Sequence, residues 1–420
     1  MNLLLVVGGL WLLATTSLHA QERQTLDGLV ATALANNPEL QAYEAEVAAA
    51  KGQRTQAGFF KNPEMSVEIG GREVSDSENV LQGNGTTFSA SIKQTFQFPG
   101  KGTLRKAIAN KNIEIAELGL EQFRLALAGQ VRVLALEYLA AEREAGAAQS
   151  VYGRSNQLAR QLGSQGDFGA KLQIETRLVQ ASLIELGAAI KTASLRREEA
   201  RTKLNALLGR PQSLPLRIGD SFSAPQKRLA ANEVIFSAQR NNPLLKIRQR
   251  ELEKSARELT ATCLDIAPDF AIGPFFSSDV AGDSEQNIGG AVTATMPVWD
   301  WNIGNIQSAK ARQRAAQALR VKAEREVGAE ILSRLKAYEL TQRQLSMIPT
   351  GLVTSIQETS TLADTQFRNG SIGAQLYLDS QTAYLNALRA SQEAVLDAWR
   401  TLFDLNLLTG GHLDSSEENR

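Results

Sequence analysis

The pentapeptide NNPEL at residues 36–40 returns as NNPLL at residues 241–245, about 205 positions later. Two more segments return in the same order and at nearly the same offset: GDFGA at 166–170 as GSIGA at 370–374, and LLG at 207–209 as LLTG at 407–410. A period of this length is too long for a solenoid repeat. We therefore interpret the chain as an internal duplication of one structural unit.

The first 20 residues have the features of a secretory signal peptide. Residues 3–13 form an apolar run too short to span a bilayer, and small residues lead up to Ala20. We expect cleavage before Gln21. Because no Cys follows the apolar run, we expect no lipid anchor.

Composition excludes several classes of protein. The 45 basic and 45 acidic residues balance, which argues against general binding of nucleic acid. The only cysteine is Cys263, so there is no intrachain disulfide. Aromatic residues are only 6% of the chain, which is typical of long helices. Beyond the signal we see no apolar run of 18 residues and expect no membrane-crossing helix.

Each copy contains two segments in which the hydrophobic period changes to two. Phe88, Ala90 and Ile92 alternate with Ser89 and Ser91, which predicts a strand with one apolar and one polar face. We predict strands at about 63–70 and 86–97 in the first copy and at about 268–276 and 287–298 in the second. The longer ones suit a bilayer, which takes about 9–11 residues per strand.

Long helices with apolar residues spaced by three and four account for most of the rest. This spacing indicates coiled-coil packing between antiparallel helices. We predict helices over 26–59, 104–162, 172–204, 305–367 and 374–408, with a kink or restart at Pro349. The predicted organisation is a signal at 1–20, a first repeat at 21–210, a connector at 211–230, a second repeat at 231–410 and a flexible tail at 411–420.

Four membrane-length strands cannot close a barrel by themselves. Unpaired edges in lipid would cost several kcal/mol per backbone group, so other chains must complete the sheet. A trimer would supply twelve strands, an even number suited to an outer-membrane barrel. We therefore expect a mainly α fold of duplicated coiled-coil helices plus β-hairpins, assembled as a homotrimeric barrel above a helical tube.

The duplicated order of these motifs resembles the TolC family of outer-membrane efflux proteins. The resemblance implies a trimeric exit duct in the outer membrane of a Gram-negative bacterium, with a periplasmic helical tunnel. It also implies two partners, a periplasmic adaptor (membrane fusion) protein and an inner-membrane pump of the RND type. The segments QTFQFPGK at 94–101 and PVWDWN at 297–302 resemble the heavy-metal branch typified by CzcC, which suggests metal cations as cargo.

The same resemblance implies two sets of functional residues. Adaptors of this family meet the tips of the helical hairpins, which here are Gly166, Asp167, Phe168 and Gly169, with Gly370, Ser371, Ile372 and Gly373. The family gate uses acidic residues shortly after the second tip. That placement assigns Asp379 to the gate, and the 204-residue offset makes Glu175 its counterpart. Rings of carboxylates select cations.

The sequence gives little support for an enzymatic function. The only histidines are His19 in the signal and His412 in the tail, so no His-based triad or His metal cluster is expected. The segment GKGT at 100–103 is not a P-loop, because the leading Gly is missing and Gly102 takes the hydroxyl position. We expect no cofactor and no metal site. Two alternatives stay open, a duct for type I protein secretion and a non-conducting secreted coiled-coil protein.

Overall fold

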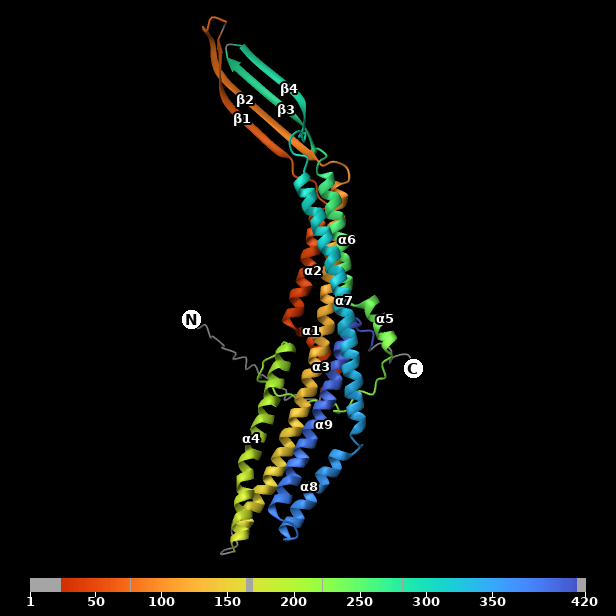
Figure 1. The fold of residues 1–420 in the computed structure, drawn as a ribbon. Coiled ribbons are helices and arrows are strands. Elements are labelled where there is room, and N and C mark those ends of the chain that lie inside the picture. The colour runs from red at the N-terminus through yellow and green to blue at the C-terminus, as the bar shows by residue number, and fades with distance from the viewer. Residues whose placement is uncertain (1–23, 76, 164–168, 221, 282, 414–420) are drawn as a thin grey trace, which may run out of the picture. The chain divides into compact units, whose positions relative to one another are not determined.

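The computed structural model describes residues 24–413 except residues 76, 164–168, 221 and 282. Its elements, labelled in Figure 1, are α1 (Leu26–Asn36), α2 (Pro38–Gln56), β1 (Glu64–Ser75), β2 (Leu81–Phe96), α3 (Lys101–Gly163), α4 (Ala170–Leu207), α5 (Ala231–Asn241), α6 (Pro243–Leu264), β3 (Phe270–Ala281), β4 (Asp283–Ala294), α7 (Ile303–Met347), α8 (Leu352–Arg368) and α9 (Ala374–Leu408). The mainly helical fold class with a small antiparallel sheet is confirmed. The predicted signal peptide and most of the tail lie outside the described residues.

The repeated Asn-Asn-Pro motif starts a new helix in each copy. Asn37 caps α2, because its side-chain oxygen accepts hydrogen bonds from the backbone N–H groups of Glu39 (2.9 Å) and Leu40 (3.1 Å). Asn242 caps α6 in the same way. The proline that follows is the first helical residue, where its missing N–H has no cost. The predicted single helix over 26–59 was therefore wrong: the chain breaks it at Asn37.

The repeated Leu-Leu-Gly-like motif ends a long helix in each copy. Gly209 follows α4 with φ +64°, and Gly410 follows α9 with φ +69°. A residue in the left-handed region after a helix lets its last carbonyls find partners, and glycine adopts it without strain. The break predicted at Pro349 is confirmed, since α7 ends at Met347 and α8 begins at Leu352.

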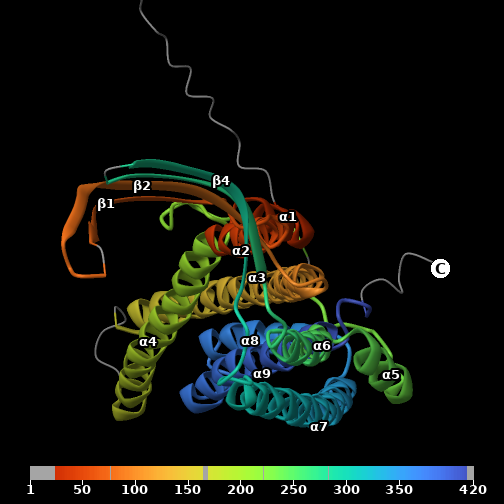
Figure 2. The ribbon, with the colours of Figure 1, turned by 90° about the horizontal axis from the view of Figure 1, so that it is seen from above.

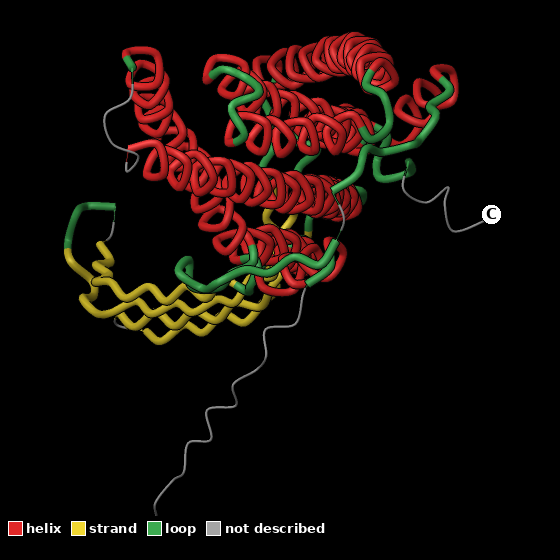
Figure 3. Tube along the Cα trace, turned by 90° about the horizontal axis from the view of Figure 1, so that it is seen from below, coloured by secondary structure: helices red, strands yellow, loops and turns green. Residues whose placement is uncertain are grey.

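The four strands form one antiparallel sheet in the order β1-β2-β3-β4. Figures 2 and 3 show it as a single curved layer. The strands extend beyond the predicted bounds at the ends remote from the helices, whereas at its other end β4 stops at Ala294 rather than at residue 298 as predicted. At the remote ends the polar segments predicted as loops continue the ladder, with Arg72 opposite Gly85 and Asp279 opposite Glu285. Paired backbone groups stabilise these segments despite their loop-like composition.

The described chain divides into two compact units, and each draws on both predicted repeats. One unit comprises residues up to 35, 131–223 and 353–392, and therefore contains α4, most of α8 and parts of α3 and α9. The other comprises residues 36–130, 224–352 and 393 onward, including the sheet, α2 and α5–α7. Helices α3 and α9 contribute to both units.

Each unit has its own apolar core. In the first unit, α3, α4, α8 and α9 contribute Leu158, Ala159, Val179, Ala363, Phe367, Ala374 and Tyr377. In the second unit, α5, α7, α9 and the segment that follows α9 contribute Val234, Ala238, Val327, Ile331, Tyr338, Leu402, Leu405, Leu408 and Leu413. The core of the first unit draws on both halves of the sequence, so the two copies fold together there, whereas these core residues of the second unit all come from the second half.

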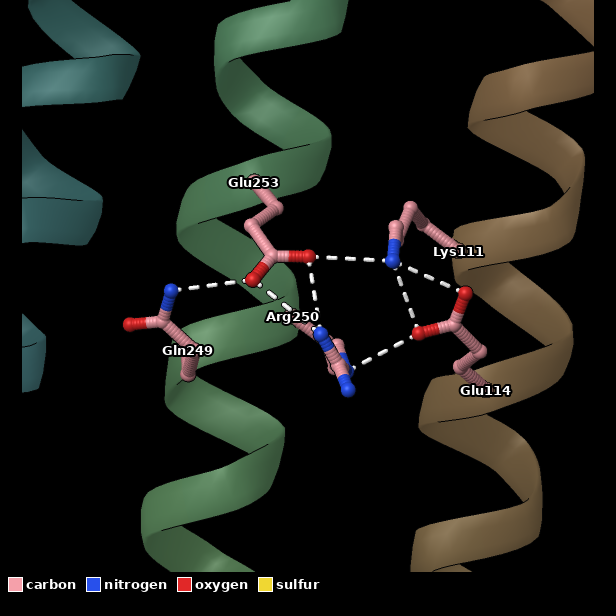
Figure 4. A network of polar contacts seen from close by, with 5 residues as sticks. All are labelled: Lys111, Glu114, Gln249, Arg250 and Glu253. Carbon is pink, nitrogen blue, oxygen red and sulfur yellow. Dashed lines mark hydrogen bonds and ion pairs between the residues drawn. The ribbon is translucent and has the colours of Figure 1, made fainter.

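A network of charged side chains joins α3 to α6 in the second unit (Figure 4). The Lys111 ammonium, almost buried, lies 2.8 Å from Glu114 and 3.0 Å from Glu253. Arg250 contacts the same two carboxylates at 2.9 and 3.0 Å. Burial disfavours the charged form of Glu253, but hydrogen bonds from Gln249, Lys111 and Arg250 outweigh it and lower its pKa to about 2. Each charge in the network has an opposite partner.

Candidate functional site

One face of the sheet is apolar and exposed. The register sets Met65 opposite Ile92 and Ile69 opposite Phe88, so the predicted apolar positions share a face. Their exposures are high: Met65 74%, Ile69 77%, Ile288 83% and Val292 73%. A continuous exposed apolar face of this kind is expected where a sheet meets lipid.

An aromatic row crosses this face at the end of the sheet from which the helices lead away. The ring of Phe60 lies 6.3 Å from that of Phe96, which in turn lies 5.8 Å from that of Phe270. Aromatic side chains concentrate at the boundary between hydrocarbon and water in membrane barrels. The row therefore marks one boundary of the apolar band.

The opposite face is polar. Asp279 of β3 forms an ion pair of 2.9 Å with Arg72 of β1 and accepts a hydrogen bond from Thr87 of β2. An aromatic residue on this face is Phe275, whose ring covers Gly289: a Cβ on that glycine would lie 2.7 Å from the ring. The alternation predicted from the sequence is thus confirmed, and it gives one wet and one apolar surface.

The sheet is open at both edges. Among the described residues, β1 pairs only with β2 and β4 only with β3, which leaves one side of each outer strand unpaired. Each of these strands has 12 residues. Long unpaired edges are templates for pairing with another chain.

Five of the eight predicted adaptor-docking residues can be located in the first unit. Gly166, Asp167 and Phe168 lie outside the described residues, whereas Gly169 immediately precedes α4. At the other tip, Gly370 has φ +71° and its N–H donates to the Phe367 carbonyl at 2.9 Å. Around that turn, Ser371 and Gly373 are exposed, and Ile372 packs partly buried against the core of this unit.

The two predicted gate acids occupy different environments in the same unit. Glu175 is half-buried on α4, and its Oε1 would lie 3.6 Å from a Cβ placed on Gly373. Asp379 is exposed on α9 and accepts a hydrogen bond of 2.9 Å from Gln375. It lines a groove of about 330 Å³ together with Ser182 and Glu185 of α4. Both acids therefore lie on surfaces where α4 and the second hairpin meet.

Sequence reasoning missed the ion pairs that a buried carboxylate forms next to this groove. Glu144 of α3 is only 7% exposed, and Arg389 of α9 donates to it through Nε at 2.7 Å. Arg196 of α4 donates at 3.5 Å. The partners are up to 245 positions apart, so no local pattern could reveal them. Their charges join three helices of the unit.

A second missed group consists of buried polar side chains nearer the tip. Arg154 of α3 donates to Ser360 of α8 and to Gln381 of α9, both at 3.2 Å. Ser155 and Tyr377 share a hydrogen bond of 2.8 Å. Hydrogen bonds of this kind favour one arrangement of packed helices over others, because an unpaired buried group is costly.

Two features of the described residues bear on alternative sites. In the described part of the chain, one helical stretch, residues 173–207 of α4, meets the length and hydropathy of a membrane span, contrary to the expectation from sequence. It is a member of the helical bundle, with Val179 in the core of its unit. The described residues contain no group of three or more His, Cys, Asp or Glu side chains placed to hold a metal ion.

An exposed apolar sheet face, a polar face behind it and long helices running from one end of the sheet define an outer-membrane channel of the efflux type. The sequence agrees, since residues 29–210 match the family described as outer membrane efflux protein. The chain resembles this family, and its homologues are channels in the outer membrane of Gram-negative bacteria with a periplasmic tunnel. Members of the family are channels rather than enzymes, and they work with an adaptor and an inner-membrane pump.

Two similar proteins are metal-resistance proteins of Cupriavidus metallidurans. The cobalt-zinc-cadmium resistance protein CzcC is 25% identical over 91% of this chain and 85% of its own length. The nickel and cobalt resistance protein CnrC is 24% identical over 74% of this chain and 73% of its own length. Among solved structures, CusC shares the fold with a TM-score of 0.74 at 16% identity, covering 93% of both chains.

Proposed function

We propose that three copies of this chain close a twelve-stranded barrel and form the exit duct of a tripartite metal-efflux system. The observation that carries the proposal is the pair of unpaired sheet edges on β1 and β4. Because the four strands alternate in direction, β4 of one copy is antiparallel to β1 of the next when the sheet closes. Twelve strands fall within the range of bacterial outer-membrane barrels.

Exposed apolar residues on the helices support the same assembly. On α4, four such side chains point away from the core of their own unit: Ile174 is 60% exposed, Leu178 41%, Ile184 78% and Leu195 59%. Ile174 and Leu178 are four residues apart and Ile184 and Leu195 eleven, both close to whole helical turns, and the two pairs lie on one broad side of the helix. A stripe of this kind on a coiled-coil helix is explained by a neighbouring helix, which a second copy would supply.

The cargo and partners follow from the relatives. CzcC and CnrC are named for resistance to cobalt, zinc, cadmium and nickel, and we infer divalent metal cations as the substrate. An RND-type pump supplies the energy, and a periplasmic adaptor docks on the tips at 166–169 and 370–373. The duct itself conducts passively, carries out no catalysis and takes no cofactor.

The gate in this proposal consists of Asp379 and Glu175. Three copies would bring up to six carboxylates to the periplasmic end of the tunnel. Such a ring attracts cations, and its members repel one another when all are charged. The position of Asp379 beside a groove on α4, and of Glu175 beside Gly373, supports a role at the contact between hairpins.

Single-channel recording in planar bilayers tests the gate. We expect Asp379→Ala to raise conductance and to reduce the preference for cations, and Glu175→Gln to add to both effects. The matched control is Asp397→Ala, an exposed carboxylate further along α9. Conductance and ion preference unchanged from wild type in Asp379→Ala would contradict the gate assignment.

A second experiment tests assembly and cargo. We expect heat-modifiable trimers in outer-membrane fractions, and we expect deletion of the gene to sensitise cells to cobalt, zinc, cadmium or nickel. A monomer in the periplasmic fraction would overturn the duct. Unchanged metal resistance with loss of a secreted polypeptide would instead favour a type I secretion duct.

A further inference from the structure

A basic groove in the second unit has no role in the channel as described. It has a volume of about 880 Å³ and lies between α5, α6 and α7. Its apolar floor includes Leu118, Val327 and Ile331, and four cationic side chains line it: Arg240, Lys246, Arg250 and Arg320. A concave surface that joins apolar area to cations suits a chain segment that carries carboxylates.

Two of the four cations are already neutralised. Arg320 pairs with Glu324 at 3.0 Å, and Arg250 belongs to the network with Glu114 and Glu253 (Figure 4). By contrast, the side chains of Arg240 and Lys246 have no hydrogen-bond or ion-pair partner within the described parts of the chain. The groove therefore has a local excess of positive charge at the junction of α5 and α6.

The last described residues of the chain are fixed beside this junction. The side-chain amide of Asn242 donates to the Leu408 carbonyl at 2.9 Å. Gly410 packs so closely that a Cβ on it would lie 2.6 Å from the Asn241 carbonyl oxygen. The Lys227 ammonium donates to the carbonyl of Leu413. Arg240 directly precedes Asn241, and Lys246 lies one helical turn beyond Asn242.

The segment after Leu413 has the opposite charge. Residues 414–420 read DSSEENR, with carboxylates at Asp414, Glu417 and Glu418 and a single base. Five residues of extended chain reach about 17 Å, which is ample for the distance of a helical turn from the anchored end. We propose that this acidic segment occupies the groove of its own chain, with Glu417 and Glu418 against Arg240 and Lys246.

Occupation of the groove would fasten the end of α9 to α5 and α6. It would also neutralise the only cations on the groove wall that lack a partner in the described residues. The groove would then be closed to anionic molecules in the periplasm. This inference concerns the fold of one chain and stands independently of cargo and gate.

Zero-length carbodiimide crosslinking of the intact protein in detergent tests the proposal, because it joins a carboxylate only to an amine that touches it. We expect a crosslinked peptide between Glu417 or Glu418 and Lys246, found by mass spectrometry after digestion. The internal control is Lys51–Glu117, an exposed ion pair of 3.2 Å on α2 and α3. Absence of the Lys246 product in a sample that forms the Lys51–Glu117 product would overturn the proposal.

Variants and isotope mixing make the result decisive. We expect Glu417→Gln with Glu418→Gln to abolish the Lys246 product and to leave the Lys51 product unchanged. A tail product at Lys227 alone, with the Lys51–Glu117 control present, would overturn the proposal. In protein refolded from mixed light and heavy chains, products within one chain support it, whereas products only between light and heavy chains would assign the groove to a second copy.

Discussion

Glu175 of α4 lies beside Gly373 in the turn between α8 and α9, with 3.6 Å between its Oε1 and the position of a Cβ on that glycine. The acid comes from the first copy of the repeat and the turn from the second. Its counterpart Asp379, 204 positions later, is exposed and bonded to Gln375 of its own helix. Equivalent positions in the two copies thus have unlike surroundings, which favours three-fold over six-fold symmetry at a trimer's tip.

The turn itself distinguishes two glycines that look alike in sequence. We expect Gly370→Ala to destabilise the protein by about 1–2 kcal/mol, because φ of +71° places an alanine Cβ against the backbone. Gly373→Ala should change stability little, because 3.6 Å to Glu175 is an ordinary contact. Thermal unfolding of the two variants checks this. Equal melting temperatures would show that the turn relaxes around either residue.

The hydrogen bond between Ser155 and Tyr377 joins α3 to α9 where both side chains are fully buried. We expect Tyr377→Phe to lower the free energy of unfolding by about 1–3 kcal/mol, because the serine hydroxyl loses its partner. Adding Ser155→Ala should recover part of that loss. A denaturant-based double-mutant cycle measures the coupling, and strictly additive effects would contradict a direct bond.

Helix seams and strand faces could be predicted because they depend on local periodicity. The positions of Phe88 and Ile92 on one face, and of Ser89 and Ser91 on the other, follow from the pleat alone. The far ends of the strands could not be predicted, because there the ladder pairs polar residues such as Asp279 and Glu285 whose sequence resembles a loop. Partner strands, rather than intrinsic preference, decide their conformation.

The candidate site was less predictable than the fold. The repeat predicts the second tip and the family resemblance assigns Asp379, but the sequence could not place Glu144 against Arg389 across 245 positions. The Asn-Asn-Pro motif does contain a local signal for the start of α2 and α6, since Asn followed by Pro is typical of a helix start. The helix predicted over residues 26–59 nevertheless runs through the motif, because the apolar pattern continues across it.

The charged network of Lys111, Glu114, Arg250 and Glu253 predicts a dependence of stability on pH. Hydrogen bonds that outweigh burial hold the pKa of Glu253 at about 2, below the ordinary 4.5. The unfolded chain therefore binds its proton first as pH falls, so this contribution is complete above pH 4.5 and is lost between 4.5 and 2. The lowered pKa of Glu253 corresponds to a contribution of at most about 3 kcal/mol to the free energy of unfolding, and screening by solvent makes it smaller.

Glu253→Gln checks that prediction. We expect the variant to be less stable than wild type at pH 7. The difference between their free energies of unfolding should become smaller as pH falls below 4.5. The comparison requires unfolding curves at several pH values in constant salt. Glu258→Gln, on the same helix but 3.7 Å from Lys254 at the surface, serves as control. A gap that stays constant from pH 7 to pH 3 would remove the electrostatic explanation.

The last prediction concerns lysine substitutions on the two faces of the sheet. Ile288 is 83% exposed on the apolar face near the middle of β4, and its neighbour Asn287 lies on the polar face. If the apolar face meets lipid, Ile288→Lys places an ammonium in hydrocarbon and should weaken folding into bilayers by about 2–4 kcal/mol. Asn287→Lys adds the same charge one residue away and should have little effect, because water in the lumen solvates it. Urea titration of folding into liposomes measures both. Equal losses for the two variants would mean that β4 does not separate lipid from water, and the assignment of the faces would then have to be reversed or abandoned.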